Sequence, residues 1–201
     1  MRRYPLRRLT PMARAPYPDI ETLPDELRTF VKRFDPLMNV FHMLAHTGPA
    51  LPHFMRLGNA ILFKGRLDPE LREIAILRVG HLLGAPYEVH QHKIVSRNIG
   101  MDEARILAVE HGEDETAFSD LENLVIRFTD EVVSSVRASD ATWDALSAKL
   151  DSGEMAELTL AVGFYSMIAV FLENFEVEIE PEGVVEDPMK RPRKAGEARP
   201  A

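Results

Sequence analysis

Two consecutive helical segments with clear start and stop signals impose the strongest constraint on how this chain folds. Asp68 followed by proline is an N-cap with proline at the first helical position, and Gly84 marks the end of that segment. Pro86 opens the next segment and Gly100 closes it. Because only two residues separate the segments, the sequence predicts a helical hairpin made of residues 69–83 and 86–99.

The same signals predict helices along the rest of the chain, and no alternating β pattern persists. The further helices are expected at about residues 24–34, 36–46, 49–63, 102–111, 119–137, 139–150 and 153–176. A chain of 201 residues with 45% hydrophobic content suits one domain with a sizeable core. We therefore expect one all-α domain over residues 19–180, with disordered basic segments at 1–18 and 181–201.

The last predicted helix is apolar on nearly all sides. Its uncharged run, Leu158 to Leu172, is shorter than the roughly 20 apolar residues that a membrane span needs. Such a helix lies either at the centre of a domain or against another subunit. We expect it to be shared with a second copy of the chain, with Ala169 on the shared surface.

Charge and cysteine content exclude several functions. The net charge is −8, and removing the ten bases and one acid of residues 1–18 and 189–201 leaves 14 bases and 31 acids. Such an acidic body disfavours nucleic acid and anionic membranes as partners. The chain has no cysteine, so thiol peroxidase and disulfide chemistry are excluded. Residues 1–18 lack the apolar segment of a secretory signal, and we expect a cytoplasmic protein.

Glu73 is the first candidate for chemistry, because it lies on an apolar helical stripe with Ile76 and Leu77. Burying a carboxylate costs free energy unless it is paired or protonated, so such a group tends to have a raised pKa and suits proton transfer. The alternative is a structural glutamate bonded to a helix N-terminus or to an arginine such as Arg78.

His92 and Glu88 are four residues apart and share one face of the predicted helix. Val95 and Ile99 continue that face, which indicates that it points inward. A histidine there, near Glu73 of the neighbouring helix, would form a proton relay that titrates near neutral pH. The alternative is a core histidine hydrogen-bonded to a carboxylate.

Other histidines and one tyrosine are weaker candidates. Tyr87 can orient a substrate or simply pack, whereas His81 and His90 are expected in the core or in a pocket wall. His42 and His46 are one helical turn apart, a spacing that can bind a transition metal. Because no sequence spacing enforces a metal site, no metal and no cofactor are predicted.

The stretch REIAILRVGHLLGAPYEVHQHKIVSRNIG, residues 72–100, resembles the core motif of the alkylhydroperoxidase D / carboxymuconolactone decarboxylase superfamily. Peroxidase members carry a redox cysteine pair at the positions of Ala85 and Glu88. APYEVHQH is similar to the Y-E-x-x-x-H form of cysteine-free members often labelled carboxymuconolactone decarboxylase-like. The segment ELTLAVGFYSMIAVFLENFEVEIEP is similar to the closing helix of that subgroup.

This resemblance implies an AhpD-like helical fold, a homotrimer or homohexamer, and a small unsaturated lactone or keto acid as substrate. It implies decarboxylation or isomerisation without a cofactor, with Glu73 and His92 as the acid–base pair and Glu88 as orienter or second acid. Tyr87, His90 and Arg78 are the expected substrate-binding residues. Lys93 and Arg97 are further candidates for the cation that an anionic substrate requires.

Two other interpretations remain open. The chain can be a non-catalytic ligand-binding or scaffold member of the peroxidase-related family that has lost its cysteine pair. It can also be a metal-dependent enzyme, with ligands from His42 and His46 or from Glu88 and His92.

Overall fold

The computed structural model describes residues 13–181, and within them it contains nine α-helices, three short 3-10 helices and no strand. The all-α prediction is therefore confirmed. The expectations for the basic ends fall largely on residues 1–12 and 182–201, which lie outside the described residues.

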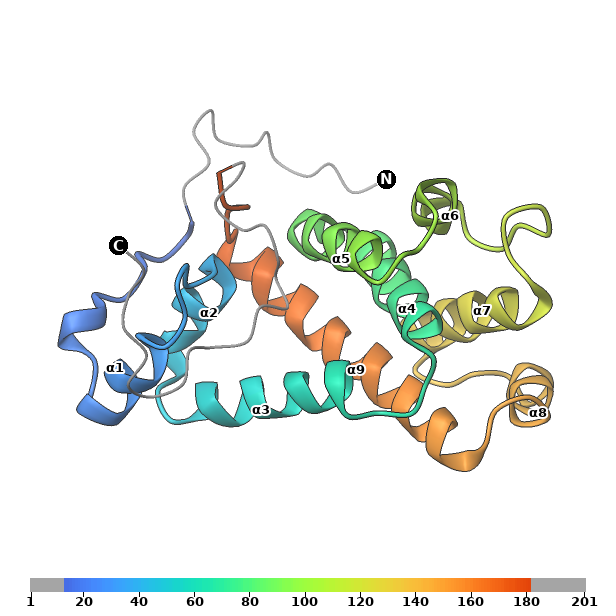
Figure 1. The fold of residues 1–201 in the computed structure, drawn as a ribbon, viewed down its shortest axis with the longest axis horizontal. Coiled ribbons are helices and arrows are strands. Elements are labelled where there is room, and N and C mark those ends of the chain that lie inside the picture. The colour runs from blue at the N-terminus through green and yellow to red at the C-terminus, as the bar shows by residue number, and fades with distance from the viewer. Residues whose placement is uncertain (1–12, 182–201) are drawn as a thin grey trace.

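The helices form two groups that are joined by one long helix (Figure 1). The first group consists of η1 (Ile20–Thr22), α1 (Asp25–Val31), α2 (Asn39–Leu44), η2 (Ala45–Thr47) and α3 (Ala50–Phe63). The second consists of α4 (Pro69–Leu82), α5 (Pro86–Asn98), α6 (Glu103–Ala108), η3 (Val109–His111), α7 (Asp120–Ser135) and α8 (Asp140–Ser147). The long helix α9 (Ser152–Phe175) runs diagonally from the side of α8 to the side of α2.

The predicted hairpin is present and its local signals act as expected. The side chain of Asp68 accepts hydrogen bonds from the backbone N–H groups of Glu70 and Leu71, at 2.8 and 3.3 Å. Gly84 adopts a φ of 64°, which favours glycine, and the next N–H donates to the carbonyl of Gly80 at 2.9 Å. The turn thus reverses the chain and leads α5 back along α4, whose contact with α5 is extensive.

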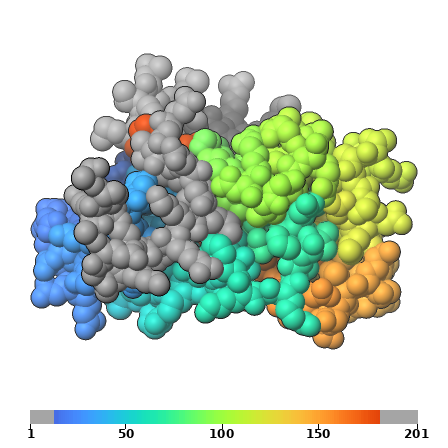
Figure 2. All heavy atoms as spheres, in the orientation of Figure 1, coloured from blue at the N-terminus to red at the C-terminus, as the bar shows by residue number. Residues whose placement is uncertain are grey.

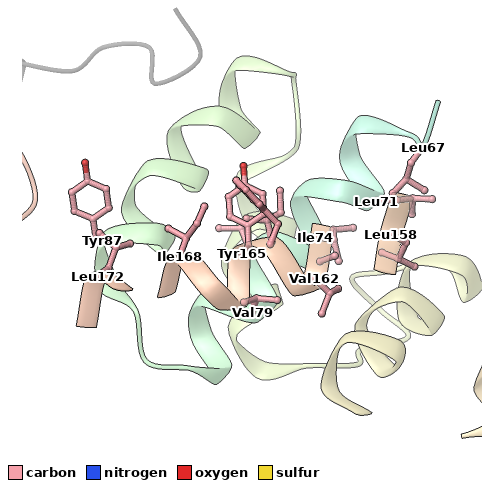
Figure 3. Packing of buried hydrophobic residues seen from close by; sticks show 14 of the residues in the cluster. Leu67, Leu71, Ile74, Val79, Tyr87, Leu158, Val162, Tyr165, Ile168 and Leu172 are labelled. Carbon is pink, nitrogen blue, oxygen red and sulfur yellow. The ribbon is translucent and has the colours of Figure 1, made fainter. Parts of the chain in front are cut away.

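Helix α4 is the centre of the core, since it packs against α5, α7 and α9. Nine of its residues are buried, between Leu71 and Gly80. Figure 3 shows Ile74 and Val79 of α4 among the side chains of α9, including Val162. The outer side of α5 forms part of the molecular surface, with α6 and α7 beside it (Figure 2). The hairpin therefore has one solvent-facing helix and one enclosed helix.

Residues 13–18 are more closely bound to the domain than the sequence suggested, because residues at the end of α9 and just after it provide partners for them. The N–H of Arg14 donates to the carbonyl of Phe175 at 2.8 Å. The N–H of Ala13 and the hydroxyl of Tyr17 donate to Glu178, at 2.7 and 2.5 Å. These contacts span more than 150 positions, so local sequence patterns do not reveal them.

The uncharged run in α9 is shorter than the helix that contains it. With 24 residues, α9 is long and apolar enough to cross a membrane, judged by length and composition alone. Half of its most apolar stretch is buried inside the molecule. Core helices of globular proteins meet the same two criteria. The inner side of α9 packs against α3, α4 and α7, as a core helix does.

The outer side of α9 is apolar and exposed. Leu160, Met167 and Val170 expose 46%, 50% and 58% of their surface. Ala169, by contrast, is only 1% exposed and points into the core of its own subunit. The expectation that Ala169 lies on a shared surface was therefore wrong, because the helix is rotated so that the neighbouring stripe faces outward.

We predict that replacing Gly80 with alanine lowers the free energy of unfolding by about 1–3 kcal/mol, the usual cost of overpacking. An added methyl carbon would lie 2.9 Å from Cγ2 of Val89, and β-branched valine has little rotamer freedom to move away. Urea denaturation measures the change. Gly80→Ala made in a Val89→Ala background is the matched control, because Cγ2 of Val89 is then absent and the added carbon should be neutral or stabilising by up to about 1 kcal/mol. Equal effects of Gly80→Ala in the two backgrounds would contradict the close packing of α4 on α5.

We also predict that the exposed side of α9 is a subunit interface of a trimer or hexamer. Met167→Glu should then shift the sedimentation coefficient towards the monomer, because a charge would be buried at a packed surface. Leu107→Glu, at a residue of α6 that is 49% exposed, is the control and should leave assembly unchanged. A wild-type protein that sediments as a monomer at micromolar concentration would refute this prediction.

Candidate active site

The hairpin brings Glu73 and His92 into direct contact. Oε2 of Glu73 lies 2.6 Å from Nδ1 of His92, and the two residues are 0% and 6% exposed. The expectation that these groups lie within hydrogen-bond reach is confirmed. A proton on Nδ1 that donates to Glu73 leaves Nε2 of His92 available for another partner.

Glu88 is that partner. Its Oε2 lies 3.5 Å from Nε2 of His92, one helical turn away on α5, and the residue is buried. Glu73, His92 and Glu88 thus form a continuous series of titratable groups, which we call the relay, with the imidazole between two carboxyl groups. Such a chain can move a proton between its ends without large displacement of any member.

Two further residues complete the surroundings of the relay, and the sequence analysis identified neither of them. Nε of the buried Arg72 donates to Oε1 of Glu73 at 3.2 Å. The ring of Tyr165, from α9, meets the ring of His92 edge to face, with centroids 4.7 Å apart at 85°. Adjacent helical residues do not normally face each other, so the spacing of Arg72 and Glu73 gave no signal. Tyr165 lies 73 positions after His92, beyond the reach of any helical period.

Burial separates the protonation behaviour of these groups. Burial raises the pKa of Glu88 to about 7, with the charge of Glu73 adding to the effect and His92 opposing it. Burial alone would lower the pKa of His92, but its charge interaction and hydrogen bond with Glu73 outweigh this and raise it above the ordinary value. Glu88 is therefore poised to give up a proton near neutral pH, next to an imidazole that favours its charged form.

Tyr87 lies beside the relay and belongs to a second cluster of polar residues. Its hydroxyl donates to Oε1 of Glu180 at 2.5 Å, and Nε2 of Gln91 donates to Oε2 of Glu180 at 2.6 Å. The backbone N–H of Asn39 also donates to Oε1 of Glu180, at 2.6 Å. Burial and the charge of Glu180 raise the pKa of Tyr87, so its hydroxyl stays protonated. Gln91 and Glu180 were missed in the sequence, although Glu180 lies in the closing segment that carried part of the resemblance.

The structure does not bring Arg78 or His90 to the site. Nε of Arg78 pairs with Oδ1 of Asp130 at 2.5 Å, and its guanidinium also donates to backbone carbonyls near η3. His90 is exposed on the outer side of α5, which corrects the expectation of a core or pocket-wall position. His81 is partly buried, and its Nε2 has no hydrogen-bond partner in the described part of the chain. Lys93 and Arg97 lie on α5, and Arg97 pairs with the exposed Glu103 of α6.

His42 and His46 bind the N-terminal segment. Their Nε2 atoms lie 2.8 Å from the carbonyl oxygens of Pro18 and Pro16, respectively. Within residues 13–181, no group of three or more His, Asp and Glu side chains is arranged to hold a metal ion. The two histidines and the Glu88–His92 pair are thus engaged in separate contacts.

The raised pKa values make stability depend on pH in a defined direction. The folded protein holds the proton of Glu88 more tightly than the unfolded chain, whose glutamate has a pKa near 4.5. This contribution is fully present below that value and is lost as the pH rises through about 7. The raised pKa of His92 acts in the same direction, since its contribution is present below 6.5 and lost as the pH rises further.

We predict that Glu88→Gln flattens this dependence. From pH 5 to pH 8.5 the variant should gain stability relative to wild type, on the order of 3 kcal/mol, because an amide has no proton to lose. Urea denaturation at the two pH values tests this. Glu115→Gln, at an exposed position, is the control and should keep the slope of the wild-type protein. An unchanged slope in Glu88→Gln would show that Glu88 is not the group responsible.

A family sequence model and several solved structures are similar to this chain. Residues 49–131 match the sequence model of the carboxymuconolactone decarboxylase family, and this range holds Glu73, Glu88 and His92. Among curated proteins, none is detectably similar in sequence.

Several solved structures share the fold. A protein from Ralstonia eutropha JMP134, described as an uncharacterized peroxidase-related protein with an alkylhydroperoxidase AhpD core, superposes with a TM-score of 0.75 at 18% identity, covering 86% of this chain and 95% of its own. An uncharacterized peroxidase-related protein from Silicibacter sp. TM1040 gives 0.73 at 14% identity, covering 91% and 98%. A protein of unknown function from Agrobacterium tumefaciens, a putative antioxidant defence protein AhpD, gives 0.64 at 22% identity, covering 69% and 97%.

At these identities the structures establish the fold alone, and the family is indicated by the motif. Over residues 49–131 the chain is therefore similar to the carboxymuconolactone decarboxylase family, and it has an AhpD-like fold without any cysteine.

Proposed function

We propose that this protein is a cofactor-free enzyme that transfers protons on a small carboxylic acid, decarboxylating or isomerising an unsaturated lactone or keto acid. The single observation that supports this is the buried chain Glu73–His92–Glu88, in which a neutral carboxylic acid adjoins an oriented imidazole. A purely structural pair would need only Glu73 and His92. A third buried carboxyl group with a pKa near 7 is costly to keep and suits an acid catalyst.

The chemistry requires little from the protein. When the bond to the carboxylate breaks, CO₂ leaves and the bonding electrons stay on the organic fragment as a dienolate. Glu88 then gives its proton to carbon, and the imidazolium of His92 returns a proton to Glu88. A proton from solvent regenerates the imidazolium, which Glu73 stabilises. In an isomerisation, the same groups remove a proton from one carbon and return it to another.

Arg72 supplies the positive charge that an anionic substrate needs. The sequence suggested Arg78, Lys93 or Arg97 for this task, but Arg72 is the cation recorded at Glu73. A buried guanidinium next to the relay offsets the negative charge of Glu73 and favours a further negative charge that develops close by. This local cation lets an acidic protein accept an acidic substrate.

A non-catalytic, ligand-binding member is the second candidate, and the deep burial of Glu73 and His92 favours it. In that case the pair would be a structural bond retained from a peroxidase-like ancestor. The two candidates differ in a simple way, since the structural role predicts loss of stability without any substrate turnover. A metal-dependent enzyme is a third candidate, which elemental analysis of the purified protein tests.

Turnover should be measured on a panel of unsaturated lactone acids and keto acids, by CO₂ release and by loss of conjugated absorbance. Glu73→Gln, His92→Ala and Glu88→Gln should each lower kcat/KM by about 100-fold or more, the scale of a positioned acid or base. The Glu73→Gln/His92→Ala double variant should lose little more than the worse single variant, because relay members act as a unit. His90→Ala, an exposed histidine on the same helix, is the control and should keep full activity.

Activity should also fall as the pH rises through about 7, because Glu88 then loses its proton. No thiol-dependent hydroperoxide reduction is expected, since the chain has no cysteine to oxidise. If the single variants of Glu73 and His92 kept full activity on an identified substrate, the relay would be abandoned in favour of the structural bond.

A further inference from the structure

A second buried carboxylate lies next to the relay, on the segment that follows α9. Glu180 is 8% exposed, and the partners recorded for its oxygens are three uncharged donors. Burying a carboxylate in this way is tolerable only because several hydrogen bonds replace its water. The three donors are the N–H of Asn39, the hydroxyl of Tyr87 and the amide of Gln91, and we call this set the carboxylate site.

The carboxylate site is held in shape by groups other than Glu180. The N–H of Val40 lies 3.4 Å from the oxygen of Tyr87 and donates to it, so the single hydroxyl proton of Tyr87 points towards Glu180. Tyr87 and Gln91 are 2% and 4% exposed and are fixed one helical turn apart on α5. Oε1 of Gln91 is buried without a hydrogen-bond partner in the described part of the chain. An orphaned amide oxygen of this kind can accept a hydrogen bond from a ligand that carries a donor.

The carboxylate site borders the relay along α5. Tyr87 precedes Glu88, and Gln91 precedes His92, so the two pairs form neighbouring stripes of one helix. Glu88 is close enough to contribute to the raised pKa of Tyr87. Figure 3 shows the hydroxyl groups of Tyr87 and of Tyr165, which covers His92, pointing to the same side. A small acid that is held at the carboxylate site would therefore place its other end towards the relay.

Few hydrogen bonds hold the segment that carries Glu180, residues 177–181, to the rest of the domain. Residues 177–181 have no regular secondary structure. Besides Glu180, the segment is held by the N–H of Val177 on the carbonyl of Leu172 at 3.1 Å, and by the contacts of Glu178 with Ala13, Tyr17 and Asn39. Withdrawing Glu180 would break the three hydrogen bonds at the carboxylate site and leave α9 intact.

We propose that the carboxylate site is a receptor for the carboxylate of a small acid, that Glu180 fills it in this structure as a tethered occupant, and that the incoming acid displaces Glu180. The identification of that acid as the substrate depends on the proposed function, whereas the receptor itself does not. This exchange would solve a problem of access, since Glu88 and His92 are almost fully buried.

A tethered occupant competes at an effective concentration set by its tether, typically millimolar or more for a short flexible segment. The apparent affinity of a free carboxylate is lowered by the fraction of molecules in which Glu180 has left. Glu180 therefore sets a concentration threshold below which the carboxylate site stays filled.

Acetate is the simplest probe, because it carries a carboxylate and little else. In Glu180→Ala the carboxylate site is vacant, and acetate should bind at least 10-fold more tightly than it binds wild type, as measured by calorimetry. Acetate should also raise the melting temperature of Glu180→Ala in a saturable manner, and chloride at equal ionic strength should not. Ile179→Ala is the matched control, because it shortens an exposed side chain of the same segment and keeps both Glu178 and Glu180.

A second substitution tests the donors directly. Gln91→Leu added to Glu180→Ala should abolish the gain in acetate affinity, since it removes one of the three donors while keeping a similar volume. If Glu180→Ala does not fold without acetate, recovery of its circular dichroism with acetate supports the proposal. If acetate does not restore it, Glu180→Gln decides, because its amide keeps one acceptor oxygen and should still bind acetate more tightly than wild type.

Three results would overturn the proposal: a folded Glu180→Ala that binds acetate no better than wild type, an equal gain in Ile179→Ala, or no gain in the Glu180→Gln variant. None of these readouts requires turnover. Tight acetate binding without activity on any acid would therefore refute the proposed enzyme and leave the carboxylate site standing, whereas activity without acetate binding would do the reverse.

Discussion

The hydrogen bond between Glu73 and His92 is the interaction on which the remaining structure depends. A carboxylate with no exposed surface sits on the central helix of the core, where an unpaired charge costs several kcal/mol. Its two oxygens are satisfied from different directions, by the side chain of Arg72 on the same helix and by the ring of His92 on the next. This requirement fixes the register of α4 against α5, because sliding either helix by one residue would leave Glu73 without its imidazole. The fold is thus built around a polar contact and not merely around apolar packing.

Ala85 and Glu88 stand where the resemblance to peroxidase members places a cysteine pair, and they show how one frame can present different side chains. Ala85 is fully buried in the turn that joins the two helices, and Glu88 takes the second position one turn further on. A thiol at position 88 can take part in redox chemistry, whereas a carboxyl group with a pKa of about 7 can exchange protons near neutral pH. The groups that orient the histidine do not need to change for this substitution. Under the proposed function, the geometry around His92 constrains the type of reaction more strongly than it constrains the substrate.

Local signals in the sequence account for most of the helices and for half of the site. Asp68, Gly84 and Gly100 act on the backbone within a few residues, so the hairpin and the Glu73–His92 contact were predictable from spacing. The partners of these residues were not, because they arrive from remote parts of the chain or break the usual helical geometry. Arg72 reaches its own neighbour in sequence through a long flexible side chain, and Tyr165 depends on how α9 crosses α4. His90 was misplaced since the apolar residues around it belong to the inner side of α5 while the histidine itself faces water.

The central place of α4 also has a consequence for the order of folding during synthesis. Its hairpin partner α5 follows at once, but α7 emerges later and α9 is the last helix described, so the buried sides of α4 lack their cover until most of the chain has been made. A nascent chain that ends before residue 152 would expose the apolar residues of α4 that α9 covers, with the carboxylate of Glu73 among them. Such an intermediate is a target for chaperones and for aggregation. The two residues of the polar contact therefore leave the ribosome well before the helix that shelters them.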